Sequence, residues 1–290
     1  MDIPLPPNIT EEQINKCRET GDYCPVLFEW YKYVSQLAFF YANIQLDSPA
    51  VKNIPKIHHS VLIGLLNRCS KLMFSNVAQS HEGLFGESTS IIDRSIFESA
   101  IKLSWLCQKN NRELFDRFIA EGLKTEIEFR NNIKGNIDAR NGEMLVIEER
   151  MLKSIDNYIA KSGLTESYIS ESKKLPNLAQ MIDDVGHERL AYIVGQKIGS
   201  HHVHGTWVSL WFQYLEEEEG VICPRGHDVP THVNQYAYIS LVVLDSISEY
   251  VKYICEDEED VKGMSSLLEG VADEILKLYQ EAVGSDGDVV

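Results

Sequence analysis

The sequence predicts an all-α protein, a multi-helix bundle with long antiparallel helices. Three observations support this class. Apolar residues recur at spacings of three and four along most of the 290-residue chain, which is the period of an amphipathic helix. Helix start signals are frequent, whereas strand patterns are nearly absent. A hydrophobic content of 44% is sufficient for a substantial core.

Most of the expected helices have a recognisable first turn. Thr10 with Gln13 forms a capping box at the first helix, and Pro25 and Pro49 suit the first turns of the next two. Further on, Ser90 pairs with Asp93 and Asn177 pairs with Gln180 in the same way, and the remaining helices follow from the apolar period. The expected helices cover residues 10–18, 25–46, 49–79, 88–108, 111–134, 144–161, 177–185, 187–215, 231–255 and 260–282.

The expected domain organisation follows from the segments between these helices. Glycine, asparagine and proline are concentrated in 134–142 and 220–230, which we expect to be loops. We expect a helical extension over residues 1–50, a bundle domain over 51–283 and a disordered tail over 284–290. No internal repeat divides the chain further.

The charge of the chain is strongly acidic. There are 44 acidic against 27 basic residues and a net charge of −17, which on average repels nucleic acids and anionic membranes. The segment from Ala50 to Ser80 is different, because it holds Lys52 and Lys56 among its cations and no acid. It is either a phosphate-binding surface or the solvated face of a helix.

Cysteine usage and the N-terminus point to a cytoplasmic protein. The six cysteines show no Cys-x-x-Cys spacing and lie mostly in apolar helical patterns, as buried free thiols do. The first seven residues lack the basic and apolar regions of a signal peptide. No apolar run approaches the ~20 residues of a membrane span, so we expect no membrane association.

The first candidate site is the pair Arg94 and Glu98. On a helical wheel both charges project from the apolar flank of the expected helix 88–108, and their four-residue spacing allows them to pair. The pair is either a half-buried ion pair that fixes helix packing or a preorganised clamp for phosphate or carboxylate.

The second candidate site is a group of histidines. In a continuous helix over 187–215, the side chains of Tyr192, Ser200 and His204 lie on one stripe, and His201 faces the same space as His204. Each histidine is either a hydrogen-bonded core residue or a proton-transfer group.

A metal site is the third alternative for these histidines. His201 and His204 could combine with Cys223, His227 or His232, but the spacing fits no strong zinc signature. Phosphate loops, dinucleotide fingerprints and nucleophile elbows are also missing from the sequence. We therefore expect no metal and no cofactor.

Two motifs in these regions resemble a known family. The segment Asp93-Arg-Ser-Ile-Phe-Glu98 and the later Ser200-x-x-Val-His204-Gly resemble uncharacterised bacterial helical proteins that are grouped as a domain of unknown function. The resemblance covers about residues 55–255. It implies which residues form a site, but it implies no activity.

A more distant resemblance is to the HEPN superfamily, which includes metal-independent ribonucleases and non-catalytic partner modules. It implies an RNA-cleaving or nucleotide-binding effector of a toxin or phage-defence type. His204 would then be the general acid or base, Arg94 would stabilise the phosphate, and Glu98 would orient Arg94. The chain departs from the arginine and histidine spacing of those enzymes, because Lys197 is the basic residue before His204.

For substrate contacts, the ribonuclease hypothesis assigns Tyr192, Ser200, His201, Lys52 and Lys56. The competing hypothesis is a non-enzymatic scaffold in which Arg94, Glu98 and His204 form a buried polar network and a protein partner binds elsewhere. Long amphipathic helices also favour a homodimer.

Overall fold

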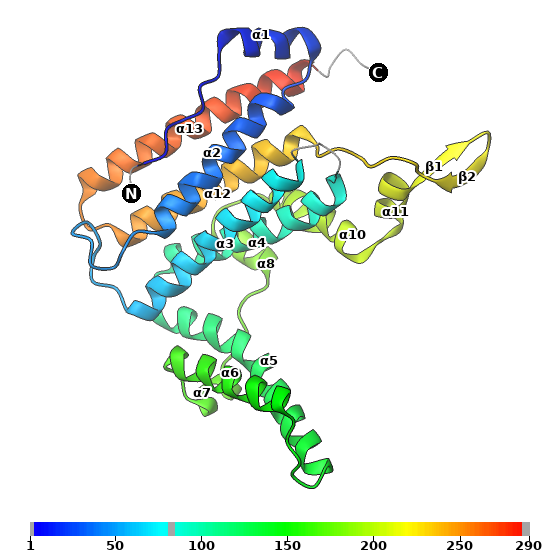
Figure 1. Cartoon of the computed structure of the whole chain (residues 1–290). Coiled ribbons are helices and arrows are strands. Elements are labelled where there is room, and N and C mark those ends of the chain that lie inside the picture. The colour runs from blue at the N-terminus through cyan, green and yellow to red at the C-terminus, as the bar shows by residue number, and fades with distance from the viewer. Residues whose placement is uncertain (1–2, 81–84, 286–290) are drawn as a thin grey trace. The chain divides into compact units, whose positions relative to one another are not determined.

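The computed structural model describes residues 3–80 and 85–285 and confirms the all-α class (Figure 1). Only one pair of short strands interrupts the helices of the described residues. The elements are α1 (Glu11–Thr20), α2 (Cys24–Ala42), α3 (Lys56–Ser80), α4 (Gly86–Lys109), α5 (Arg112–Ala139), α6 (Val146–Ser162), α7 (Glu166–Glu171), α8 (Leu178–Asp184), α9 (Arg189–Tyr192), the π-helix η1 (Ile193–Ile198), α10 (Gly199–His204), α11 (Trp207–Tyr214), β1 (Leu215–Glu218), β2 (Val221–Pro224), α12 (Val233–Ile254) and α13 (Glu258–Ser285).

The chain forms two compact units. Unit 1 combines residues 1–109 with 178–290, and unit 2 consists of residues 110–177. This division was not expected from the sequence, and the expected boundary at residue 50 stays a prediction. Of the expected tail, residues 284 and 285 belong to α13, and 286–290 lie outside the described residues.

The core of unit 1 is a four-helix arrangement. Helices α2, α3, α4 and α12 each pack against two of the others, and α13 covers α12. Helices α3 and α4 are antiparallel, because Arg68 Nε donates to Ser99 Oγ at 3.1 Å while Asn76, further along α3, reaches Asp93. The largest fully buried side chains include Tyr31 of α2, Phe97 and Trp105 of α4, and Tyr250 of α12.

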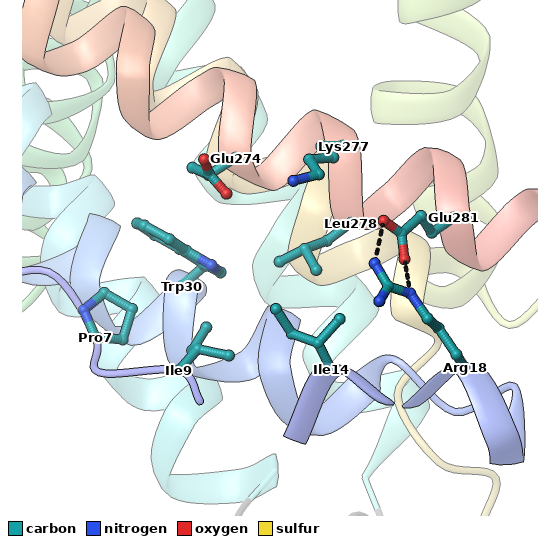
Figure 2. A pocket seen from close by; sticks show the side chains of 9 residues that line it. All are labelled: Pro7, Ile9, Ile14, Arg18, Trp30, Glu274, Lys277, Leu278 and Glu281. Carbon is teal, nitrogen blue, oxygen red and sulfur yellow. Dashed lines mark hydrogen bonds and ion pairs between the residues drawn. The ribbon is translucent and has the colours of Figure 1, made fainter. Parts of the chain in front are cut away.

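Helix α1 begins with the expected capping box and is tied to α13. The Thr10 and Gln13 side chains each accept a hydrogen bond from the other's backbone N–H. Arg18 donates two hydrogen bonds to Glu281 of α13, at 2.9 and 3.0 Å, at one end of a hollow of about 140 Å³ (Figure 2). Ile14 and Leu278 line the same hollow, so apolar contact and an ion pair together hold α1 in place.

Unit 2 is built from α5, α6 and α7 around its own small core. Ala120, Leu123 and Ile133 of α5 pack with isoleucines of α6 and α7. Arg130 is only 8% exposed and binds Glu166 at 2.9 Å and Asp156 at 3.3 Å. The expected loop 134–142 is partly wrong, because α5 continues to Ala139.

Three other expectations about secondary structure were wrong. Residues 49–55 are not helical, and α3 begins after Pro55 instead of Pro49. Ser90 does not start α4, which begins at Gly86, and its hydroxyl donates to the Gly86 carbonyl at 2.6 Å. The segment 215–224 forms an antiparallel hairpin in which Leu215 pairs with Pro224.

The expected continuous helix over 187–215 is also wrong, and its break positions the site. The backbone of Gly205 is left-handed, with φ of 55°, so α10 ends there and α11 starts in a new direction. Before it, the wider turn of η1 changes the register of the segment. Glycine tolerates a left-handed backbone without steric cost, and this explains the position of the break.

Candidate functional site

Arg94 lies on α4 and bridges to the helices that follow residue 189. Its Nε donates to Ser200 Oγ at 3.1 Å. When the Gln196 amide is oriented with its oxygen toward Arg94, that oxygen accepts from Nε at 3.2 Å and from Nη2 at 2.5 Å. Two neutral side chains of η1 and α10 therefore fix the guanidinium without neutralising its charge.

Glu98 makes a weaker contact with Arg94 than the sequence suggested. Its carboxylate is 3.9 Å from Arg94 Nη1 but 2.6 Å from Lys102 Nζ. All three side chains are between 23% and 33% exposed. Because Glu98 is shared with Lys102, the three residues together keep one positive charge.

Two glycines allow η1 and α10 to lie directly on α4. A Cβ atom on Gly195 would be 2.5 Å from the ring of Phe97, and one on Gly199 would be 2.9 Å from Arg94 Cβ. Contacts this short require the absence of a side chain. The four-residue spacing of the glycines puts both on the face of the segment that contacts α4, and the same face presents Gln196 and Ser200 to Arg94.

His204 ends α10, one turn after Ser200. The two residues are four apart, so their side chains leave the same side of the helix about 6 Å apart. His204 is exposed, whereas His201 is partly buried and its Nδ1 is 2.8 Å from Thr206 Oγ1. The row formed by Arg94, Ser200 and His204 thus runs from a partly buried cation to an exposed imidazole.

His202 points in another direction and contacts Glu87 of α4. Its Nδ1 is 3.8 Å from Glu87 Oε1, and burial lowers the pKa of His202 while Glu87 opposes this effect. Glu87 also accepts hydrogen bonds from Ser209, at 2.6 Å, and from Tyr214. This carboxylate connects α10 and α11 to α4.

Helix α11 has its polar residues inside and its apolar residues outside. Ser209 and Gln213 are its buried residues, whereas the side chains of Trp207, Phe212 and Tyr214 are more than half exposed. The rings of Trp207 and Trp211 are 5.6 Å apart. Exposed aromatic surfaces of this kind are typical of binding sites.

This aromatic surface belongs to a segment without acidic residues. From Arg189 to Leu215 the chain contains no aspartate or glutamate, but it contains Lys197 and the three histidines of α10. Lys197 Nζ lies 5.6 Å from the centre of the Tyr192 ring. The acidic character of the chain is therefore interrupted next to Arg94.

Lys52 and Lys56 do not lie beside Arg94. Lys52 Nζ is 4.7 Å from the Tyr253 ring. Burial raises the pKa of Cys107, near the C-terminal end of α4, and Lys52 is close enough to oppose part of this rise. Arg94 is 13 residues earlier on this helix, a separation of about 20 Å at 1.5 Å per residue. Lys56 starts α3, which is antiparallel to α4, and so it lies toward the same distant end.

Arg94 also lines a large cavity of unit 1, with a volume of about 940 Å³. Asp93 and His202 contribute to the lining, whereas His204 does not. The guanidinium and the exposed imidazole therefore do not share this cavity.

Potential metal ligands gather at a different place from the one considered in the sequence. Within residues 3–80 and 85–285, the group with suitable spacing is Glu216, Glu218 and Cys223 of the hairpin. His201, His204, His227 and His232 do not join such a group there. The hairpin acids are partly or fully exposed and give no independent sign of a bound ion.

Sequence reasoning missed the contacts that organise the site. Gly195 and Glu87 were not identified as site residues, and Asp93 was interpreted as a helix-start signal and as part of a family motif. The acid-free run after Arg189 was a visible signal for part of this surface. No sequence signal identified Glu87, because its partners lie more than 100 residues away.

Comparison with known proteins identified one family. A model of a family of unknown function, DUF5677, matches residues 59–222, which extend from α3 to the second strand. Both sequence motifs, around Arg94 and around His204, lie within this match. No curated protein and no solved structure matches the chain. None of the helices in the described residues combines the length and the apolar character of a membrane span.

Proposed function

The chain belongs to the DUF5677 family, and we propose that it cleaves single-stranded RNA without a metal ion, using Arg94 and His204. One observation carries the proposal. Ser200 binds Arg94 at 3.1 Å, and His204 follows on the same side of α10 one turn later, with its ring exposed. In this proposal the fixed cation and the accessible imidazole act on the same phosphodiester, and the one-turn spacing of Ser200 and His204 supports it.

His204 supplies the proton transfer in this proposal. Its imidazole removes the proton of the ribose 2′-hydroxyl, the hydroxyl oxygen attacks the adjacent phosphorus, and the bond from phosphorus to the 5′-oxygen breaks. The leaving oxygen takes a proton from water or from the imidazolium. The products are a cyclic phosphate and a free 5′-hydroxyl, and the reaction consumes no other reagent.

Arg94 stabilises the charge on the phosphate. Ser200 and Gln196 occupy its Nε and Nη2, and Nη1 has no contact shorter than the 3.9 Å to Glu98 among the interactions of the described residues. Nη1 can therefore donate to a phosphate oxygen while the rest of the guanidinium stays fixed. Preorganised donors of this kind stabilise transition states without reorganisation at the moment of reaction.

The aromatic surface of α11 supports single-stranded RNA as the substrate. Unpaired bases stack on exposed aromatic rings whatever their sequence, and nearby cations follow the backbone. Trp207 and Trp211 offer such rings, and the acid-free run contributes Arg189 and Lys197. Tyr192 and His201 belong to the same run, whereas Lys52 and Lys56 lie toward the other end of α4, about 20 Å from Arg94.

A scaffold is the second candidate function, and the same aromatic surface favours it. In this case Arg94 only fixes η1 and α10 on α4, and the outward side chains of α11 bind a protein, including a second copy of the chain. We also propose, for either function, that the protein forms a homodimer, is located in the cytoplasm and takes part in phage defence.

The test is cleavage of an unstructured RNA in the presence of EDTA. We expect products with cyclic phosphate ends from the wild type and a loss of about 10²–10⁴-fold in rate for His204→Ala, which is the usual contribution of a general acid or base. His227→Ala is the matched control, since His227 is also exposed but lies in the segment after β2. Equal rates for His204→Ala and the wild type, or no cleavage by either, would contradict the proposal and leave the scaffold.

A further inference from the structure

The cavity that Arg94 lines has the size and the lining of a small-molecule site. Its volume of about 940 Å³ is within the range of ligand pockets. Most of its lining is apolar, with Leu190, Val194 and Ile198 on one side and Tyr238 and Ile239 of α12 on another. The cavity lies wholly within unit 1.

A buried carboxylate without a cationic partner lines this cavity. Asp93 is 7% exposed and accepts hydrogen bonds from Asn76 at 2.6 Å, from Gln235 at 2.8 Å and from Tyr31 at 3.4 Å. These donors are all neutral, and no ion pair with Asp93 forms within the described part of the chain. The neighbouring Arg94 points to Ser200 instead.

The hydrogen bonds suit an ionised carboxylate, but its burial opposes ionisation. Three donors converge on the two oxygens of Asp93, which is the arrangement that a charged carboxylate accepts. Burial nevertheless raises the pKa of Asp93 to about 8, because a charge in a poorly solvated site is costly unless an opposite charge is close. A cation in the cavity would remove this cost.

The remaining charges of the lining are consistent with a cationic ligand. Asp22 and Glu188 also line the cavity, and Arg94 is the one lysine or arginine among its lining residues. The net charge of −17 attracts cations to the protein from a distance. A fatty acid or another anion would meet three acidic side chains and one arginine, whose Nε and Nη2 already have partners.

We propose that this cavity binds a cationic amphiphile, an apolar molecule with one protonated nitrogen, and that Asp93 is its counter-ion. The apolar body lies along α9, η1 and α12, and the ammonium group donates to the Asp93 carboxylate. Arg94 borders both sites, but the proposed ligand does not depend on the RNA-cleaving function, because neither His204 nor the tryptophans of α11 line the cavity.

Three matched probes test the charge preference by titration calorimetry near neutral pH: naphthylethylamine, naphthylethanol and naphthylacetate. They share one ring system and differ in the charge of the end group. We expect the amine to bind at least about tenfold more tightly than the alcohol, as one hydrogen-bonded ion pair implies, and the acetate to bind most weakly. An alcohol that binds as tightly as the amine, an acetate that binds best, or an amine that does not bind would overturn the proposal.

Two variants locate the binding. Asp93→Asn should remove the preference for the amine over the alcohol and retain binding of the alcohol. Val194→Trp should fill the cavity and weaken binding of both, whereas Val146→Trp, the same change at an exposed site in unit 2, should not. If Val194→Trp folds and its affinity for the amine is unchanged, the ligand does not bind in this cavity. The result for Val194→Trp can be interpreted even if Asp93→Asn does not fold.

Discussion

The contact between η1 and α4 leads to a quantitative prediction about Gly195. A methyl group at this position would lie 2.5–2.6 Å from three atoms of the Phe97 ring, whereas carbon atoms normally approach to about 3.5–4.0 Å. Phe97 is fully buried and its ring stacks on Tyr238 with centroids 6.0 Å apart, so it cannot simply move aside. The ring or the whole of η1 must shift by about 1 Å.

The expected cost of Gly195→Ala follows from two opposing effects. Overpacking of a filled core costs about 1–3 kcal/mol, and alanine gains about 1 kcal/mol over glycine in helix propensity. We expect a net loss of about 0–2 kcal/mol in the free energy of unfolding, which leaves Gly195→Ala about 1–3 kcal/mol less stable than a variant that has only the propensity gain. Gly64→Ala is the matched control. Gly64 is also helical, and no other atom lies within 4 Å of the position of the new methyl group. This variant therefore has the gain in helix propensity without the cost of overpacking.

The assay is urea unfolding followed by tryptophan fluorescence. The four tryptophans, Trp30, Trp105, Trp207 and Trp211, belong to unit 1, and unit 2 contributes none. The signal therefore reports on the unit that carries both substitutions. If Gly195→Ala proves as stable as Gly64→Ala, then η1 does not lie against Phe97, and the positioning of Ser200 beside Arg94 loses its basis.

Two further predictions concern charged groups. The raised pKa of Asp93 means that the folded protein holds a proton that the unfolded chain releases, so stability is lost as the pH rises from about 4 to about 8. The measurement is urea unfolding of the wild type and of Asp93→Asn across this pH range. The free energy of unfolding of the wild type relative to the variant should fall by more than about 1 kcal/mol, the equivalent of one pKa unit. A difference that stays constant with pH would contradict the burial of this carboxyl. In unit 2, hydrogen bonds from Arg130 lower the pKa of Glu166. Glu166→Ala should leave the buried Arg130 with one carboxylate partner, Asp156, and speed amide hydrogen exchange in α5 and α7, which the lost pair joins. The difference from the wild type should vanish in acid, where the wild-type carboxyl is protonated. Unchanged exchange would show that the ion pair does not stabilise unit 2.

The helical fold was predictable because the apolar period survives in nearly every helix. The main failure, the expected helix over 187–215, came from reading that period through Gly205. A glycine followed by threonine is a helix end followed by a helix start, so this break had a local signal. The π-helical turn had none in the sequence; in the structure its Gly195 lies directly against Phe97 of α4.

The site was only partly predictable for a related reason. A helical wheel identified Arg94 as a charge on an apolar flank, and the structure gives it partners in η1 and α10. A helical wheel could not show which end of the bundle holds Lys52, because that depends on the antiparallel packing of α3 on α4. The role of Asp93 was hidden in the same way, because Tyr31, Asn76 and Gln235 come from three separate helices.

The insertion of unit 2 between α4 and α8 has a consequence for how the protein can be modified. Helix α8 packs on α4, and Lys109, the last residue of α4, reaches Asp184 at 3.2 Å, so unit 1 holds both attachment points by its own contacts. The inserted segment has its own apolar centre and contributes nothing to the lining of the large cavity. A variant in which a short flexible linker replaces residues 110–177 should therefore still fold its unit 1.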